Sequence, residues 1–399
     1  MRLRILLLAV TMLGLGGTAH ASLLRVGTCP GASYATIGDA LAAALDGDTI
    51  FVCAGVYPEQ VVVNRRLRMR GAPGAIIKPA NMVANSTSLR TSEAIAAVMV
   101  VTAKSTITGI EIDGSQNGLA GCSPSGPLLM GIFVRATSAA IKKNRVHGLQ
   151  MADATCDNGA AIYVQGNGTA VSRVQLFRNE VSQYQRSGIV VSESGTQGLV
   201  RRNTVTGNGS TPLIAQNGIQ FSFGGTGVVQ GNVVTNNQTV SNGCVFDGGN
   251  LSFQSDRGLI NNNTFTGNTG GVIITGNQNR VLHNTVDGLA SGNPVGLDGI
   301  AVYGDSNVVN ANIVRNQSHA GVILEGDGNS ARGNRIVNTS GAALCAPTAA
   351  APGCDVQLSV CGIGLWIAGG SRNSAGGNTF GSNDEDMRDD GTDTGRKPH

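Results

Sequence analysis

The chain has 399 residues, a formal net charge of +3 and 58 glycines, whereas only 13% of its residues are charged and 4% are aromatic. Along the sequence there is no basic stripe with interleaved aromatic residues, which argues against nucleic acid as a partner. β-Branched residues are dense between the glycines, and this pattern excludes a disordered glycine-rich linker.

Residues 1–21 have the pattern of a secretory signal peptide. Arg2 and Arg4 precede an apolar run over residues 5–15, and small residues then allow cleavage near Ala21. The apolar run is too short to span a bilayer, and no later stretch is long enough. We therefore expect a secreted or periplasmic protein without membrane insertion.

All eight cysteines follow the predicted cleavage site. An even number of cysteines in an exported chain favours disulfides over a metal site. Short separations favour two local pairs, Cys29–Cys53 and Cys122–Cys156. The remaining four allow three connectivities; they are Cys244, Cys345, Cys354 and Cys361.

The first predicted element of the mature chain is a short amphipathic helix. Residues from Thr36 to Leu45 are rich in alanine and leucine, and Gly47 follows as a stop signal. A repetitive fold must protect the open end of its core, so we expect this helix to be an amino-terminal cap.

A sequence repeat then accounts for most of the chain. It reads glycine, isoleucine or valine, any residue, an apolar residue, a polar turn, and finally asparagine followed two residues later by an apolar residue. Examples are GIVVSESGTQGLVRRNTV from Gly188 and GIAVYGDSNVVNANIV from Gly299. Alternation with period two predicts strands. Units of about 20–30 residues cannot bury an apolar face alone and must stack.

The predicted fold is therefore all-β: a single-stranded parallel β-helix solenoid over residues 22–381, with a short capping α-helix. Apolar positions of the repeat form its core, including Ile189, Ile219, Val272, Ile300 and Val322. The repeated asparagines are expected to stack as a hydrogen-bonded ladder at one bend; they are Asn144, Asn203, Asn232, Asn263, Asn284, Asn312, Asn334 and Asn378.

Extra residues occur at one place in the coil, between the asparagine strand and the next Gly-Ile strand. Insertions on one face of a solenoid usually mark its binding face. We therefore expect a groove on the sheet built from Gly-Ile strands, beside the insertions at 148–158, 208–217, 237–250, 287–298 and 341–361. Residues 382–399 are polar, without apolar periodicity, and are expected to form a flexible tail.

The opening segment YATIGDALAAALDGDTIFVCAGVYPEQVVV and the Gly-Ile and Asn repeats resemble right-handed parallel β-helix proteins of the pectin lyase-like superfamily. The resemblance covers most of the mature chain and implies the right-handed coil. Many such proteins cleave or epimerise acidic polysaccharides in a groove on this kind of sheet, and others are not enzymes. The chain lacks the Gly-His-Gly element of polygalacturonases and the Asp-Pro-His-Glu element of alginate epimerases.

Residues at or near the outer face of the Gly-Ile sheet are the candidates for chemistry. A lyase or epimerase needs a base and a group that steadies an anion, whereas hydrolysis needs two carboxylic acids. Asp247, Asp298 and Glu325 are the candidate acids, and Arg135 or Tyr303 would assist elimination. Candidate substrate-binding residues are Tyr163, Gln220, Gln254 and Trp366.

Asp305 and Asp327 occupy matching positions of neighbouring coils, so Ca²⁺ is the one cofactor to consider, although a repeated turn is the favoured interpretation. No other metal site is indicated. The sequence favours a monomeric carbohydrate-active protein, a lyase, hydrolase or epimerase acting on an acidic polysaccharide. A non-catalytic carbohydrate-binding or cell-surface protein is the alternative, followed by a purely structural solenoid.

Overall fold

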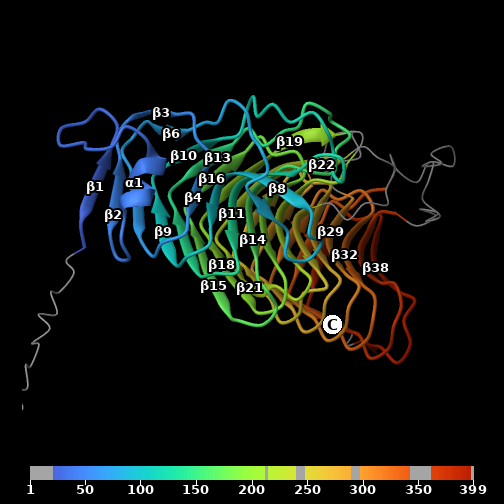
Figure 1. Ribbon diagram of the computed structural model, residues 1–399. Helices are drawn as coiled ribbons and strands as arrows, with labels where there is room; N and C mark the ends of the chain where they lie inside the picture. The colour runs from blue at the N-terminus through green and yellow to red at the C-terminus, as the bar shows by residue number, and fades with distance from the viewer. Residues whose placement is uncertain (1–20, 212–213, 240–247, 289–296, 342–360, 397–399) are drawn as a thin grey trace, which may run out of the picture.

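The computed structural model describes residues 21–211, 214–239, 248–288, 297–341 and 361–396. These residues form one long solenoid in which each complete coil contributes a strand to each of three parallel sheets (Figure 1). We call the sheets A, B and C, and each coil visits them in the order C, A, B.

Sheet A has 14 strands. They are β1 (Leu23–Val26), β2 (Thr49–Val52), β5 (Arg68–Gly71), β9 (Ser105–Thr108), β12 (Ala139–Lys142), β15 (Ser172–Phe177), β18 (Thr196–Arg201), β21 (Thr226–Gln230), β24 (Leu259–Asn261), β27 (Arg280–Leu282), β30 (Val308–Asn310), β33 (Ser330–Arg332), β36 (Ser374–Gly376) and β39 (Gly395–Arg396).

Sheet B has 12 strands, and from β13 on each of them follows the asparagine bend of its coil along the chain. They are β3 (Gly55–Tyr57), β6 (Ala75–Ile77), β10 (Glu111–Asp113), β13 (Arg145–His147), β16 (Glu180–Ser182), β19 (Thr204–Thr211), β22 (Val233–Thr239), β25 (Thr264–Thr266), β28 (Thr285–Asp287), β31 (Ile313–Arg315), β34 (Arg335–Val337) and β37 (Thr379–Gly381).

Sheet C contains the Gly-Ile strands. They are β4 (Val61–Val63), β8 (Ala94–Val101), β11 (Leu128–Arg135), β14 (Ala160–Gln165), β17 (Ser187–Ser192), β20 (Asn217–Ser222), β23 (Gly248–Phe253), β26 (Gly270–Ile274), β29 (Asp298–Val302), β32 (Ala320–Leu324), β35 (Ile363–Ile367) and β38 (Glu385–Asp389). The short strand β7 (Ser86–Thr87) pairs antiparallel with β8.

Apolar side chains from all three sheets fill the solenoid. Ile189, Ile219, Val272, Ile300 and Val322 are each 0% exposed, which confirms the predicted core row. At the start of the Gly-Ile strands the backbones of neighbouring coils approach closely. A Cβ on Gly299 would lie 2.4 Å from the carbonyl oxygen of Gly321, so a side chain there would push the coils apart.

The asparagine ladder is confirmed at the bend between sheets A and B. In each step, the side-chain oxygen of one asparagine accepts hydrogen bonds from the backbone and side-chain nitrogens of the asparagine in the preceding coil. For Asn232 and Asn263 both distances are 2.9 Å. Asn179, which the sequence did not single out, continues the ladder between Asn144 and Asn203. A second ladder of Asn279, Asn307, Asn329 and Asn373 lies between sheets C and A.

The predicted cap is helix α1 (Ile37–Ala43), which contacts β1, β2 and β4 at one end of the solenoid (Figure 1). Thr36 is its N-cap and accepts a hydrogen bond of 3.1 Å from the backbone N–H of Asp39. The carboxylate of Glu59 accepts the N–H groups of Ile37 and Gly38 at 2.8 Å each. These acceptors satisfy donors that a helix start leaves open.

Both predicted local disulfides are confirmed: Cys29–Cys53 and Cys122–Cys156 are bonded. Cys361 is also disulfide-bonded. Cys244, Cys345 and Cys354 lie outside the described residues, as do residues 1–20 of the predicted signal peptide. No helix in the described part of the chain is long and apolar enough to cross a membrane.

The expected tail at 382–399 needs correction, because β38 and β39 lie within it and continue sheets C and A. Met387 points inward opposite Leu365, while the neighbouring positions in β38 are charged. A single apolar residue does not produce a period-two pattern, so this strand could not be recognised from the sequence. A charged last strand also discourages pairing with another chain.

Candidate functional site on sheet C

One row of side chains faces outward along sheet C. Strand register aligns Tyr163, Val190, Gln220, Leu251, Ile273, Ala301, Ile323 and Trp366 on successive coils. With neighbouring strands about 4.8 Å apart, the row extends over roughly 34 Å. Tyr163, Gln220 and Trp366 are half-buried members of this row, whereas the five aliphatic members between them are buried.

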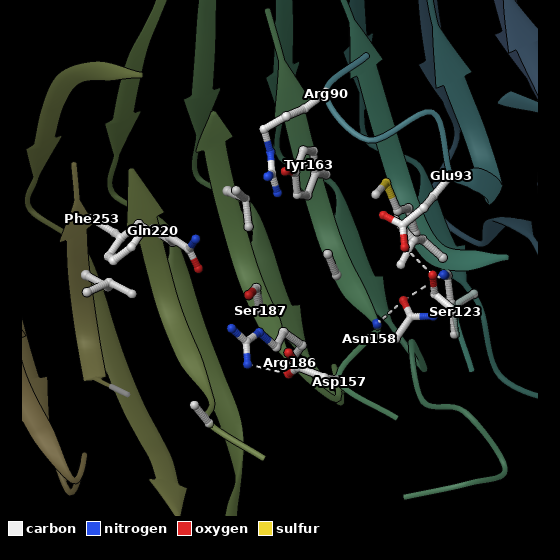
Figure 2. Close-up of a pocket in the computed structure, with 18 of the residues that line it drawn as sticks. Arg90, Glu93, Ser123, Asp157, Asn158, Tyr163, Arg186, Ser187, Gln220 and Phe253 are labelled. Carbon is white, nitrogen blue, oxygen red and sulfur yellow. Dashed lines mark hydrogen bonds and ion pairs between the residues drawn. The ribbon is translucent and has the colours of Figure 1, made fainter. Parts of the chain in front are cut away.

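A groove of about 620 Å³ occupies the amino-terminal half of this row. Figure 2 shows Tyr163 on β14 and Gln220 on β20, two strands apart, with Arg90 and Glu93 near one end of the groove and Arg186 and Asp157 near the other. The groove lies at the predicted place, because Asp157 belongs to the 148–158 insertion. The loop that contributes Arg90 and Glu93 was not predicted.

Two side chains of sheet C hold that loop in position. The side-chain oxygen of Gln165 accepts the backbone N–H of Leu89 at 2.8 Å, and its amide nitrogen donates to Ser88 at 3.2 Å. Arg135 donates through Nε to the carbonyl oxygen of Thr87 at 3.1 Å. The structure therefore places Arg135, a predicted catalytic residue, in an anchoring contact.

Two arginines line the groove, together with the acids Glu93 and Asp157. The Nε of Arg90 lies 3.2 Å from the carboxylate of Glu193, and its guanidinium lies 4.1 Å from the ring centre of Phe223. Phe223 in turn meets Phe253 edge to face at 5.5 Å. Arg186 forms an ion pair with Asp157 at the other side of the groove. Both arginines belong to charge pairs at the rim.

Glu93 ties the loop to the neighbouring turn. Its carboxylate accepts hydrogen bonds from the hydroxyls of Ser123 and Thr91, the latter at 2.5 Å. These hydrogen bonds, that of Ser123 first, lower the pKa of Glu93 below its usual value because they stabilise the charged form. Glu93 is therefore an ionised anchor at neutral pH.

Tyr163 forms part of the groove floor. Its ring packs against Phe133 with the centroids 6.1 Å apart. Burial raises the pKa of the Tyr163 hydroxyl, with Ser192 and Glu193 close to it. The phenol is thus neutral near pH 7 and offers an apolar ring with a polar edge.

A second cluster lies further along the same face. Asp298 is the first residue of β29, and register pairs it with Ala320 of β32. His319 immediately precedes Ala320, and its Nδ1 lies 2.7 Å from the Asp298 carboxylate. Trp366, on β35, meets the imidazole edge to face at 5.8 Å. The side chains of Asp298 and His319 are 21% and 11% exposed, so both are partly accessible.

Tyr303 and Glu325 directly follow β29 and β32, so they lie on neighbouring coils, at the other end of these strands from Asp298 and His319. Although 38% of the surface of Tyr303 is exposed, desolvation raises the pKa of its hydroxyl, and the carboxylates of Asp298 and Glu325 raise it further. The hydroxyl therefore keeps its proton at neutral pH and can donate it.

Four predicted residues thus converge in the second cluster: Asp298, Tyr303, Glu325 and Trp366. Tyr163 and Gln220 lie in the groove. Gln254 is exposed but lies just beyond β23: Leu251 and Phe253 take the outward positions of that strand, and Gln254 begins the following turn with φ 50°. Asp247 lies outside the described residues.

The sequence analysis missed His319, Arg90, Arg186 and Phe253 as site residues. A usable signal was present, since His319 stands directly before a Gly-Ile strand, one coil after Asp298. Arg90 had no such signal, because its loop lies outside the repeat.

The stacked aspartates belong to a ladder of turns. The carboxylate of Asp305 accepts the N–H of Asp327 at 2.8 Å, and Asp327 accepts the N–H of Ser371 at 2.7 Å. Their positions are thereby explained without Ca²⁺. Among the described residues, the one group of three His, Cys, Asp or Glu side chains close enough to share a metal is Cys122, Asp153 and Cys156, whose cysteines form a disulfide.

Comparison with known proteins agrees with this architecture. Residues 102–296 match the family model described as right handed beta helix region, and residues 255–397 match the model described as periplasmic copper-binding protein (NosD). No curated protein sequence matches the chain.

Two solved structures illustrate the likeness. The GH136 lacto-N-biosidase from Eubacterium ramulus has a TM-score of 0.55 at 10% identity, covering 90% of this chain and 68% of that one. The mannuronan C-5 epimerase AlgE4 A-module of Azotobacter vinelandii has a TM-score of 0.52 at 12% identity, covering 90% and 94%. At these identities the likeness concerns the fold. The predicted fold and handedness are confirmed, and the chain is a right-handed parallel β-helix repeat protein.

Proposed function

We propose that the protein is an exported carbohydrate-active enzyme that performs proton transfer on an acidic polysaccharide lying across sheet C. The observation that carries the proposal is the 2.7 Å contact between His319 and Asp298, beside Tyr303 on the outward face. A carboxylate that orients an imidazole is a common arrangement for general acid–base catalysis.

The roles follow from the geometry. When Nδ1–H of His319 donates to Asp298, Nε2 is the basic nitrogen of the neutral imidazole and can take a proton. In an acidic sugar, the carbon beside the carboxylate carries the proton that a lyase or an epimerase removes. Tyr303 holds its proton and would deliver it either to the leaving oxygen, which completes elimination, or to the opposite face of the ring carbon, which inverts it.

Hydrolysis fits less well. It requires two carboxyl groups that act directly on the two sides of the glycosidic bond. Asp298 is instead hydrogen-bonded to His319.

The groove residues would bind the polysaccharide. Arg90 and Arg186 can attract sugar carboxylates, and the rings of Tyr163 and Phe253 can pack against sugar faces.

Two lines of observation support export and a glycan substrate. The signal-peptide pattern of residues 1–21, the two disulfides and the match to a periplasmic family favour a periplasmic or secreted location. The two similar folds belong to a lacto-N-biosidase and a mannuronan epimerase, both of which act on carbohydrates.

A copper site, which the name of one matching family suggests, does not fit the described residues. The one candidate metal cluster there lies outside residues 255–397, and its cysteines are oxidised to a disulfide. Copper sites are built from imidazole and thiolate or thioether ligands. No step of the proposed reaction uses copper.

A non-catalytic glycan-binding protein is the second candidate. The observation in its favour is that the groove's charged groups already have partners: Arg186 with Asp157, Arg90 with Glu193, and Glu93 with Ser123. A ligand would add to these contacts without requiring chemistry.

The test is an assay of purified protein on pectins, alginate and glycosaminoglycans. Ultraviolet absorbance detects unsaturated products, reducing-end assays detect hydrolysis, and proton NMR detects inverted uronates. We expect unsaturated or inverted products from the wild type, and a loss of about 10²-fold or more in Asp298→Asn.

Asp256→Asn is the matched control, because Asp256 is exposed on a turn between sheets C and A and accepts the N–H of Asn277 through one oxygen, which Asn retains. It should keep full activity. Binding to a polysaccharide with none of the three products would favour the second candidate, and equal activity of Asp298→Asn and wild type would remove the pair from the mechanism.

A further inference from the structure

The outer face of sheet A carries a separate groove of about 800 Å³ on β5, β9, β12 and β15. Five cations line it: Arg66, Arg68, Lys104, Lys142 and Arg173. The one acid in its lining, Asp46, accepts the backbone N–H of Arg66 at 3.0 Å. This groove lies on a different face from the cluster around Asp298.

Coil stacking produces this concentration of charge. Register pairs Arg68 with Thr106 and Ala139 with both Ser105 and Val174. Extending it places Arg66, Lys104, Ser138 and Arg173 in one row on consecutive coils, with steps of about 4.8 Å. The small side chain of Ser138 leaves the hollow between Lys104 and Arg173.

None of the five cations forms an ion pair with a carboxylate in the part of the chain that the structure describes. Like charges on neighbouring strands repel one another. A row of unneutralised cations in a hollow is therefore a destabilising arrangement that a multivalent anion would relieve.

The sequence analysis found no basic stripe, and the structure corrects that interpretation for this face. Residues 66, 104 and 173 are far apart in the sequence. Arg66 stands in a short arginine-rich segment with Arg65, Arg68 and Arg70, but nothing in the local sequence connects that segment with Lys104 or Arg173. The solenoid brings them together because each lies one or two coils from the next.

We propose that this groove is a second binding site, whose ligand is a linear acidic polysaccharide. Its lining contains no aromatic side chain on which a nucleic-acid base would stack. Its apolar members are small or buried and unsuited to insertion into a membrane; they are Ala21, Leu67, Ala139 and Ala140. Repeated carboxylates or sulfates on an extended chain match a row of regularly spaced cations. The ligand class is that of the proposed function, but the site is independent of the Asp298 cluster.

The experiment uses the full mature chain carrying Asp298→Asn, so that polymer is not consumed. Binding of fluorescently labelled alginate, polygalacturonate and heparin is measured at several salt concentrations. The test variant adds Arg66→Gln, Lys104→Gln and Arg173→Gln. The control variant adds Arg280→Gln, Arg332→Gln and Arg335→Gln, which changes the net charge equally outside the groove. Thermal unfolding verifies that both are folded.

We expect the groove variant to bind at least one of the polymers roughly tenfold more weakly, with a shallower dependence on salt, while the control stays within about twofold of its parent. Equal affinities for the two variants would overturn the proposal. So would tighter groove-dependent binding of single-stranded DNA or of anionic phospholipid vesicles than of any polysaccharide. Failure of the Asp298 assay leaves this result unaffected, because no turnover is measured here.

Discussion

The hydroxyl of Tyr303 has a specific place in the proposed reaction, because burial and, after it, two nearby carboxylates raise its pKa and keep it protonated. Tyr303→Phe removes only that hydroxyl. We expect kcat to fall by about 10²-fold with little change in KM, since the ring remains. Steady-state kinetics on the best polysaccharide of the panel checks this. Unchanged kcat would show that another group supplies the proton.

The lowered pKa of Glu93 predicts that the thermal stability of the protein depends on pH. Its pKa is lowered in the folded protein, so its stabilising contacts with Ser123 and Thr91 are fully present above the pKa of the unfolded chain and are lost as pH falls through the lower folded value. Glu93→Gln should therefore lower the melting temperature near pH 7 and cease to matter in stronger acid. Melting curves across the acid range test this, with Ser123→Ala expected to shift the transition to higher pH.

Individual site residues were predictable only where the repeat determined whether a side chain faces the core or the outside. Period-two alternation correctly gave Tyr163, Gln220 and Trp366 outward positions. It did not identify Phe253 as an outward residue of β23, and it assigned to that strand Gln254, which lies one residue beyond it. His319 was not predicted because its contact with Asp298 joins neighbouring coils, and Arg90 was not predicted because a tertiary contact with Gln165 positions its loop.

Each asparagine of the ladder should contribute measurably to the free energy of unfolding. Asn263 accepts from Asn232, and its amide donates to the carbonyl of Val229 and to Asn284 at 2.9 Å each. Asn263→Ala leaves buried groups without partners, so we expect a loss of about 2–4 kcal/mol in the free energy of unfolding. Urea unfolding measures it. The exposed Asn310→Ala should change stability by less than about 0.5 kcal/mol, and equal effects would contradict the ladder's role.

The disulfide Cys122–Cys156 should affect both stability and the sheet C groove, because it joins the segment of Ser123 to that of Asp157. Its separation of 34 residues predicts a contribution of about 3–4 kcal/mol. The double change Cys122→Ser/Cys156→Ser should lower the melting temperature and weaken glycan binding. Removing Cys29–Cys53, at the capped end, should lower the melting temperature alone. Identical binding by both variants would contradict the groove assignment.

Strands, the cap and the main ladder were predictable because each repeats a simple local rule: alternation, an N-cap followed by a stop signal, and a fixed place for asparagine. The loop over residues 88–93 and strand β38 were not, because each depends on contacts with distant coils. Strand β38 is recognisable only through its pairing with β35, which offers Leu365 to its single inward residue, Met387.

Taken as a whole, the solenoid presents chemically different faces at a regular spacing. Sheet C carries the groove, the Asp298–His319 pair and aromatic side chains, whereas sheet A carries unpaired cations. Stacked coils convert residues that recur at one repeat position into rows about 4.8 Å apart, which suits polymeric ligands. The row from Tyr163 to Trp366 connects the groove with the proposed catalytic cluster without a break in register.

A crystal structure of Asp298→Asn bound to an acidic oligosaccharide, taken from the polymer that the wild type modifies, tests the central claim most directly. We predict that the sugar chain lies across β20, β23, β26 and β29 of sheet C, with the ring carbon beside a carboxylate within reach of Nε2 of His319 and the Tyr303 hydroxyl on that sugar. An oligosaccharide bound only on another face of the solenoid, or on sheet C but away from His319, would contradict the account.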